Sequence, residues 1–340
     1  MLYRTKKFNE FLRRIAERNK KFWRTYANIG VVAAVIEMFV VIYLLSTNIQ
    51  RFLYSPTEAT PITPLLPGVT IDFRWFPYIL IAASVAITIH EMAHGIISFS
   101  ENIPVKSSGI VLAPITFGGF VEPDEDVFKK TTLSAKLRVL AVGSFTNIVA
   151  GILVLLLLFA IFVPFSGVLV MTVSESGPAY TARMRPWEVI YQIEGNKISN
   201  VEEFLSFMRA IGPGITLTFE TSGGIRNIIT GVSAENASKG IIGISDFLTH
   251  NSIKWGEMNP QFSYHLFMTL NWTSMLLINV AVFNMLPLFP FDGEACVYSF
   301  LREKLKRGLR NSRIIINAIA LVLLVSNVGL TFIRYGLTPF

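Results

Sequence analysis

The sequence predicts a multi-pass α-helical membrane protein with about five spans, a re-entrant β-hairpin and an inserted α+β domain. Two observations support this fold class. The 340 residues are 52% hydrophobic and only 16% charged, and the mean hydropathy of +0.51 is too high for an ordinary soluble domain. Several apolar stretches also reach about 20 residues, the length at which a helix crosses a bilayer.

The N-terminal segment, residues 1–26, carries nine Lys or Arg residues against two acids, with apolar residues at roughly helical spacing. This pattern is typical of a basic amphipathic helix on an anionic membrane surface, and a solvated charged tail remains the alternative. Either way, the excess of positive charge predicts a cytoplasmic N-terminus. Residues 28–46 form the first predicted span, and the proline-rich stretch 47–75 fits an outside loop.

The second predicted span, residues 78–100, contains the motif H-E-x-x-H. The four-residue spacing places His90 and His94 on one face of a helix, as in helical zinc sites. Three ionisable groups within five positions of an apolar span are costly unless they are paired or bind a metal, which argues against an ordinary core histidine. Glu91 stands where metallopeptidases carry the base that activates water.

Residues 107–126 are apolar and β-branched but are interrupted by a pair of glycines, so they are too irregular for a span. Such a segment is tolerated at membrane depth only where protein or a wet cavity covers it, which predicts a re-entrant hairpin beside the metal site. Its strand edge at Gly118, Gly119 and Phe120 would offer backbone groups to an extended substrate. A simple connecting hairpin is an equally good interpretation.

The third predicted span, residues 135–165, carries the sequence GSFTN at residues 143–147, near its cytoplasmic start. Its asparagine, Asn147, lies at the predicted depth of the histidines, where an amide donor can stabilise a developing oxyanion. Packing of helices through the small residues Gly143 and Ser144 explains this stretch equally well.

Residues 167–260 change character to short alternating strands and polar turns. The order strand, turn, short helix, strand, Gly-Asn turn, strand, helix, with the sequences SGPA and WEVIYQIEGNKI, resembles a PDZ domain. The resemblance implies peptide binding by strand addition, and a steric cap that binds nothing remains the alternative. The span count places this domain outside the cell.

The fourth predicted span, residues 262–286, ends in NMLPLFPFDGE. Because Pro287 and Pro290 cannot continue a helix, we expect Asp292 on an unwound segment at the cytoplasmic end, at the depth of the histidines. A basic stretch and a fifth span, residues 314–333, follow. The chain is therefore expected to divide into the segments 1–26, 27–166, 167–260 and 261–340.

The motifs HEMAHG, GSFTN and LFPFDG, in this order around the PDZ-like insert, resemble the site-2 protease family of intramembrane zinc metallopeptidases. The resemblance implies that His90, His94 and Asp292 bind one zinc ion per chain, that Glu91 is the general base, and that Asn147 assists at the substrate carbonyl. It further implies a multi-pass protein of the cell membrane that hydrolyses peptide bonds within the transmembrane segments of single-span proteins. The PDZ-like domain would gate or select these substrates.

This sequence departs from the family pattern at two positions. The family usually has Gly-Pro before the asparagine, where this chain has Gly143-Ser144, and a second glycine after Asp-Gly, where it has Glu294. The first departure weakens the role assigned to Asn147, and the second adds a rival carboxylate close to Asp292.

Composition excludes several other classes of protein. One cysteine cannot form an internal disulfide framework, and four histidines are too few for a multi-histidine di-iron site. The net charge of +7 is concentrated beside the spans, which favours membrane topology over nucleic-acid binding. A catalytically silent scaffold, a divalent-metal transporter and a zincin of the prenyl-protein peptidase type remain as alternatives.

Overall fold

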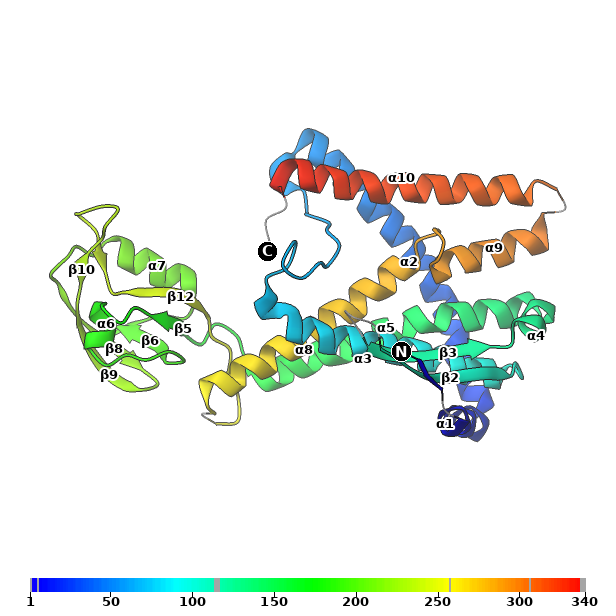
Figure 1. Ribbon diagram of the computed structural model, residues 1–340, viewed down its shortest axis with the longest axis horizontal. Coiled ribbons are helices and arrows are strands. Elements are labelled where there is room, and N and C mark those ends of the chain that lie inside the picture. The colour runs from blue at the N-terminus through cyan, green and yellow to red at the C-terminus, as the bar shows by residue number, and fades with distance from the viewer. Residues whose placement is uncertain (1, 5, 113–116, 257, 306, 337–340) are drawn as a thin grey trace. The chain divides into compact units, whose positions relative to one another are not determined.

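The computed structural model describes residues 2–4, 6–112, 117–256, 258–305 and 307–336 (Figure 1). The chain forms two compact units. Residues 1–155 and 271–340 make up the first, here called the membrane unit, and residues 156–270 make up the second, the inserted unit.

Among the described residues, five helices are long and apolar enough to cross a membrane. They are α2 (Lys20–Tyr54), α3 (Phe76–Ser100), α5 (Leu133–Ile161), α8 (Pro260–Asn284) and α10 (Leu309–Tyr335). These helices confirm the predicted multi-pass helical fold. Short 3-10 helices at Pro56–Glu58 and Phe73–Trp75 interrupt the loop between α2 and α3.

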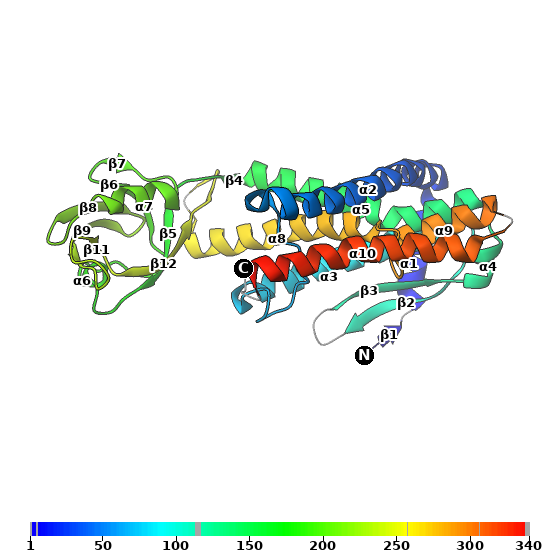
Figure 2. The ribbon, with the colours of Figure 1, turned by 90° about the horizontal axis from the view of Figure 1, so that it is seen from above.

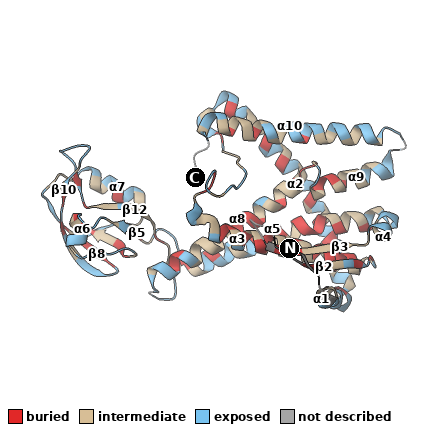
Figure 3. Ribbon diagram, viewed as in Figure 1, coloured by how far each residue is buried: buried red, intermediate tan, exposed pale blue. Residues whose placement is uncertain are grey.

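The spans differ in how much of their surface other parts of the protein cover. Thirteen residues of α3 are buried but only three of α10, and α10 accordingly carries little of the buried colour in Figure 3. Apolar side chains that remain exposed on a span are solvated by lipid, so α10 is a peripheral helix and α3 a central one.

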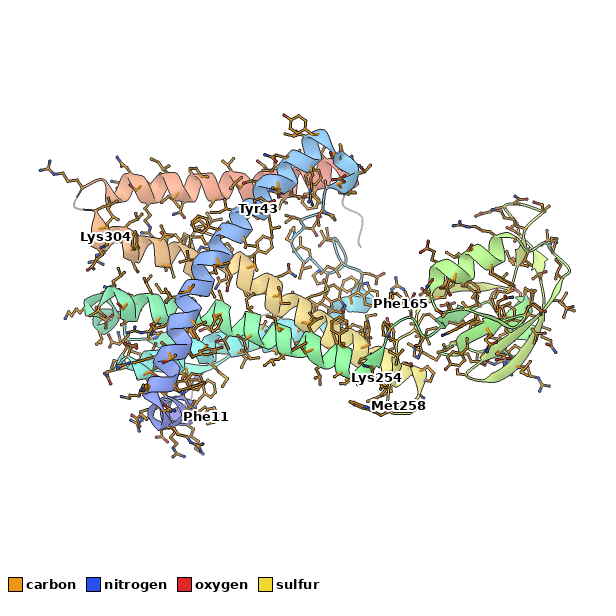
Figure 4. All side chains as sticks on the ribbon, turned by 180° about the vertical axis from the view of Figure 1, so that it is seen from behind. Phe11, Tyr43, Phe165, Lys254, Met258 and Lys304 are labelled. Carbon is orange, nitrogen blue, oxygen red and sulfur yellow. The ribbon has the colours of Figure 1, made fainter. Side chains whose placement is uncertain are left out.

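Helix α2 crosses the other spans at a steep angle (Figure 4). Its buried stripe contacts α5 at Gly30, the chain just after α8 at Ala34, and α10 at Leu45. Glu37 belongs to the same stripe, and neither of its carboxylate oxygens has a hydrogen-bond partner among the described residues.

The N-terminal segment forms a short strand, β1 (Leu2–Arg4), and the helix α1 (Lys6–Arg18). The helix is amphipathic as expected, but Leu12 and Ala16 on its apolar face are fully buried against Ile96 of α3. Much of the apolar face that was expected to meet lipid therefore packs against protein, while the basic side chains from Lys7 onward stay exposed.

The predicted hairpin is present as the antiparallel strands β2 (Val105–Leu112) and β3 (Phe117–Pro123). Strand β1 pairs with the far edge of β2, which gives the order β1-β2-β3 (Figure 2). Glycine lets β3 lie directly against α3, because a Cβ atom at Gly118 would come within 2.7 Å of the side chain of Ile87. A short helix, α4 (Glu125–Lys130), follows the hairpin.

The segment after α8 differs in one respect from the prediction. Residues 285–291 are not helical, as the prolines require, but Asp292 is the first residue of a further helix, α9 (Asp292–Lys304), instead of lying on the unwound segment. Nothing prevents a new helix after Pro290, and a carboxylate is favourable in the first turn because the helix N-terminus is electropositive. A Cβ atom at Gly293 would collide with the backbone carbonyl of Met285, so glycine allows α9 to begin here.

The inserted unit is an antiparallel sheet with two short helices. The strands run in the order β12-β5-β6-β8-β9, with β7 paired to β6. Their bounds are β5 (Val168–Val173), β6 (Val189–Ile193), β7 (Asn196–Lys197), β8 (Thr216–Thr221), β9 (Gly224–Ile229) and β12 (Ile244–Thr249), and the helices are α6 (Pro178–Thr181) and α7 (Val201–Arg209).

The core of the inserted unit contains fully buried side chains such as Phe219, Met184 and Ile190. Two small ribbons complete it: β4 (Phe162–Val163) with β13 (Ser252–Ile253), and β10 (Gly231–Val232) with β11 (Gly240–Ile241). The order of strands and helices from β5 to α7 is the one that the sequence predicts, and the inserted α+β domain is confirmed.

Candidate active site

Three predicted metal ligands meet in the membrane unit. The Nε2 atoms of His90 and His94 lie 3.0 Å apart, and Asp292 Oδ2 lies 3.0 Å from the first and 3.2 Å from the second. Within the described ranges, this is the one group of three or more His, Cys, Asp or Glu side chains with ligand atoms all within 4.8 Å of one another. We call it the ligand triad.

A backbone hydrogen bond sets the protonation of His94. Its Nδ1 atom lies 2.6 Å from the carbonyl oxygen of Val139, which can only accept, so Nδ1 carries the proton. In the neutral imidazole this leaves Nε2, which faces His90 and Asp292, as the nitrogen that can bind a metal. Two imidazoles and one carboxylate, both imidazoles buried, are the donor set of a catalytic zinc site that keeps one position open. The residues present fit a metal ion.

Asn284, the last residue of α8, supports the ligand triad. Its Nδ2 atom donates to Asp292 Oδ2 at 2.7 Å and lies 3.2 Å from His90 Nε2. The sequence analysis did not assign Asn284 a role. Its position was a usable clue, because a polar residue at the end of an apolar span stands directly before the proline-containing segment. Side chains that orient metal ligands in this way contribute to metal affinity.

Glu91 lies beside the ligand triad but is not one of its members. Its Oε2 atom accepts a hydrogen bond of 3.1 Å from the backbone N–H of Val121 on β3, and its side chain lines the same cavity as His94 and Asp292. A carboxylate next to a metal site, with one oxygen held by the hairpin, is well placed to exchange protons with water in that cavity.

Helix α5 touches both imidazoles through a glycine. A Cβ atom at Gly143 would lie 2.5–2.6 Å from atoms of His90 and His94, so a larger residue cannot occupy this position without moving them. The neighbouring Ser144, which replaces the family's proline, is buried with its hydroxyl 3.5 Å from Asn284 Nδ2.

Asn147 lies one helical turn beyond Gly143, and therefore on the same face of α5. It is fully buried, and neither of its amide atoms has a hydrogen-bond partner among the described residues. Asn147 thus shares a face of α5 with Gly143 but makes no hydrogen bond to the ligand triad, and its predicted role at the substrate carbonyl stays a prediction.

Two other side chains of α9 are accounted for without a metal. The guanidinium group of Arg313 binds both carboxylate oxygens of Glu294, at 2.5 and 3.1 Å, and lies 4.4 Å over the ring of Tyr298. Glu294, the alternative carboxylate to Asp292, is thus held in an ion pair with a residue of α10. Cys296 is buried, and burial together with the nearby Asp292 raises the pKa of its thiol, which keeps it protonated.

The predicted substrate-binding residues Gly118, Gly119 and Phe120 lie on β3, next to α3. The N–H of Gly119 donates to Thr88 Oγ1 at 3.1 Å, one of two β3 donors that α3 side chains engage. Phe120 pairs with Gly109 of β2, whose other edge carries β1. The hairpin therefore lies beside Glu91 as expected, and its binding of substrate remains a prediction.

A cavity of about 290 Å³ adjoins the ligand triad. It is lined by Glu91, His94 and Asp292 together with residues of β3, α4 and α5. A molecule that enters this cavity therefore meets Glu91 and two members of the ligand triad, His94 and Asp292.

Comparisons with known proteins agree with this site. A model of peptidase family M50 matches residues 78–326. An uncharacterised protein of Methanocaldococcus jannaschii is 28% identical over 278 residues, which cover 80% of this chain and 70% of that protein. A membrane-bound transcription factor site-2 protease homolog of Arabidopsis thaliana is 24% identical over 206 residues, 58% of this chain and 40% of that protein.

Among solved structures, the PDZ domain of an SdrC-like protein from Listeria monocytogenes matches 24% of this chain and 90% of that domain, at 24% identity. Its TM-score of 0.22 is too low to support a structural conclusion.

The family model spans well over half of the chain and includes Glu91 and every member of the ligand triad. It confirms the resemblance to the site-2 protease family that the motifs indicated. The chain therefore belongs to peptidase family M50, whose members are membrane metalloproteases.

Proposed function

We propose that this protein is a zinc endopeptidase that cleaves single-span membrane proteins within their transmembrane segments. The observation that carries the proposal is the convergence of His90, His94 and Asp292 beside Glu91, on helices apolar enough to lie in a membrane. One zinc ion per chain would act there as a Lewis acid that polarises the scissile carbonyl and makes water acidic enough to attack at neutral pH.

The protein's own residues would move the protons. Glu91, open to the cavity and held by Val121, takes a proton from the attacking water and returns it to the leaving amine. Asn284 keeps Asp292 oriented through the amide hydrogen bond to Oδ2. The buried amide of Asn147 has no hydrogen-bond partner among the described residues. Its N–H groups would stabilise the negative charge that develops on the substrate's carbonyl oxygen.

An intact helix shields its own peptide bonds, so the substrate must be extended before it is cut. We propose that the strand at Gly118, Gly119 and Phe120 pairs with this extended segment and holds it beside Glu91. Such pairing would compete with the hydrogen bonds that Thr88 and Glu91 accept from the backbone of β3. Binding of the substrate would then free the carboxylate of Glu91 from Val121.

The inserted unit would select substrates by the size of their outer part. Loop charges favour a cytoplasmic N-terminus and an extracytoplasmic inserted unit in the cell membrane, where a PDZ-like domain of residues 167–260 would meet the substrate's ectodomain. Deleting residues 167–250 should then speed the cleavage of substrates with bulky ectodomains relative to short ones. Unchanged selectivity in the deletion variant would contradict the size-filter role.

The decisive experiment compares the wild type with Glu91→Gln in detergent, on a single-span substrate, with zinc content measured for both. We expect equal zinc content, cleavage by the wild type, and a loss of at least about 100-fold in the variant, because a general base contributes on that order or more. Glu58→Gln, which alters an exposed glutamate outside the site, is the matched control and should cleave normally. Zinc in every protein with cleavage in none would favour the scaffold alternative.

A further inference from the structure

We propose that a cavity between α1 and α2 binds one anionic phospholipid, and that the bound lipid holds α1 against the hairpin beside Glu91. The cavity has a volume of about 370 Å³ and is lined by Ile15, Arg18, Asn19, Phe22 and Trp23. It lies at the elbow, residues 18–21, where α1 ends and α2 begins, at the end of α2 near Phe11 in Figure 4. Such a site goes beyond the proposed proteolytic function and does not depend on it.

The elbow lies at the depth expected for lipid headgroups. The first predicted span begins at residue 28, and five residues at about 1.5 Å each place Trp23 about 8 Å before it. Aromatic rings gather at this level: the ring centroid of Trp23 lies 5.1 Å from that of Phe22 and 5.9 Å from that of Tyr26. Tryptophan and tyrosine are enriched where a membrane protein meets the headgroups. Phospholipid is therefore the most abundant molecule beside the cavity.

Charge complementarity selects an anionic lipid. Residues 7–24 hold seven Lys or Arg and only two Glu. Arg18 is the charged residue of the cavity lining, and both Arg18 and the neighbouring Lys21 are exposed. Arg24, by contrast, is already paired with Glu101 at 3.1 Å. Among the described residues neither Arg18 nor Lys21 has a carboxylate partner, so both are placed to meet a lipid phosphate.

The apolar walls fit the upper part of an acyl chain. Ile15 and Trp23 are half-buried, and Phe22 is 53% exposed. Since an apolar cavity of about 150 Å³ holds benzene, one of about 370 Å³ admits a headgroup with the first methylenes of a chain, while the rest of the lipid stays in the bilayer. An amphiphile covers both parts of this lining, whereas a soluble anion would leave the aromatic surface in water.

Helix α1 connects the cavity to the candidate active site. Trp23 Nε1 donates a hydrogen bond of 2.9 Å to the carbonyl of Ile15, which ties the two helices together at the elbow. Both residues also pack against the apolar cluster around Leu12, as does Val121 of β3. Val121 is the residue whose N–H is bonded to Glu91. A lipid that holds α1 in place therefore stabilises the strand beside the proposed base.

The first measurement is the affinity of the full-length protein in detergent for phosphatidylglycerol and for phosphatidylcholine with the same chains, by native mass spectrometry. One basic residue near an anionic lipid surface changes affinity by about 5-fold. We expect phosphatidylglycerol to bind at least about 5-fold more tightly, and Arg18→Gln to remove most of that preference. Arg13→Gln is the matched control, because it removes an exposed charge about 140° around α1 from Arg18. Equal losses in the two variants, or no preference in the wild type, would overturn the site.

The apolar wall is tested through Phe22. Phe22→Ala should weaken the binding of phosphatidylglycerol, whereas Phe39→Ala, at a position of α2 that is 71% exposed, should not. Glycerol phosphate, which has a phosphate but no acyl chains, should compete only weakly. Competition as strong as that of the lipid would assign the cavity to a soluble phosphate and contradict the proposal.

The last measurement locates the lipid without any variant. Phosphatidylglycerol with a photoreactive acyl chain is irradiated with the protein in nanodiscs, and the labelled residues are identified by mass spectrometry. We expect labelling within residues 15–23, and slower hydrogen exchange of residues 117–123 in phosphatidylglycerol than in phosphatidylcholine. Labelling confined to other exposed residues of α2, such as Phe39, would refute the site, and unchanged exchange would refute its link to the hairpin. Labelling at the elbow of a protein that cleaves no substrate would retain the lipid site and reject the protease function.

Discussion

Gly143 determines how closely α5 approaches the imidazoles. Because a Cβ atom would lie 2.5 Å from His90 Cε1, Gly143→Ala should displace His90 or His94 from the ligand triad. A shift of about 1 Å in a reacting group can cost about 100-fold in rate. We expect a loss of that order in kcat/KM together with weaker zinc binding, measured by competition with a chelator.

Gly329→Ala is the control for this substitution, since a Cβ atom at Gly329 would meet no described atom within 4 Å beyond its own stretch of helix. Normal zinc affinity in Gly143→Ala would show that the ligands relax around the added methyl group.

Asn284 holds Asp292 by a hydrogen bond of 2.7 Å. Loss of a group that orients a metal ligand typically lowers metal affinity by about 10- to 100-fold. Asn284→Ala should therefore weaken zinc binding by this factor, as measured by chelator titration. Asn279→Ala on the same helix removes an exposed amide that donates to the carbonyl of Met275, and it should leave the affinity unchanged. Equal affinities in the two variants would contradict a supporting role for Asn284.

At the scale of elements, α10 is coupled to the helix that carries Asp292. Arg313 binds Glu294, and Asn317 accepts a hydrogen bond of 2.7 Å from the backbone N–H of Phe289 in the segment before α9. Glu294 is 5% exposed, so removing its partner leaves a buried carboxylate uncompensated. Arg313→Ala should lower the free energy of unfolding by about 1–3 kcal/mol.

Thermal unfolding in detergent tests this coupling, with Arg310→Ala at an exposed position of α10 as the control. The double variant Glu294→Met, Arg313→Met should recover most of the loss, because it removes the buried charge as well as its partner. A double variant as unstable as Arg313→Ala would show that the contact acts through packing instead of charge.

The helices were the most predictable elements. Length and hydropathy alone place five spans, because an apolar stretch of about 20 residues has few alternatives. The spacing of His90 and His94 likewise fixes their common face. Asp292 was assigned as a ligand by resemblance, and its position at the start of α9 was not foreseen because prolines end a helix without specifying where the next begins.

Contacts between distant segments could not be predicted from the sequence. The carbonyl of Val139 and the amide of Asn284 act on the ligand triad only because α5 and α8 pack against α3, and no local pattern encodes that arrangement. The pairing of β1 with β2 is of the same kind, since its two strands lie about 100 residues apart. Local periodicity thus predicts elements, and tertiary packing determines their partners.

For the whole molecule, acidity should destabilise the inserted unit through His250. This side chain is 4% exposed, and burial lowers its pKa from 6.5 to about 4. As the pH falls from 6.5 toward 4, the unfolded chain takes up a proton that the folded chain does not, so the stability present above pH 6.5 is lost over this range. The loss amounts to about 3 kcal/mol at about 1.4 kcal/mol per pH unit.

Hydrogen exchange of the β5 amides in the full-length protein at pH 7 and pH 4.5 measures this effect. His250→Gln should flatten the pH dependence, since glutamine does not titrate. An equally steep dependence in the variant would assign the effect to other groups.

The ligand triad joins residues that are 202 positions apart, His90 and Asp292, and the whole inserted unit is encoded between them. Ribosomes add roughly 5–20 residues per second, so about 10–40 s separate the synthesis of the imidazoles from that of the carboxylate. During this interval the growing chain carries two histidines without their third partner. The order in which the chain is made therefore keeps the peptidase incomplete until its fourth span has left the ribosome.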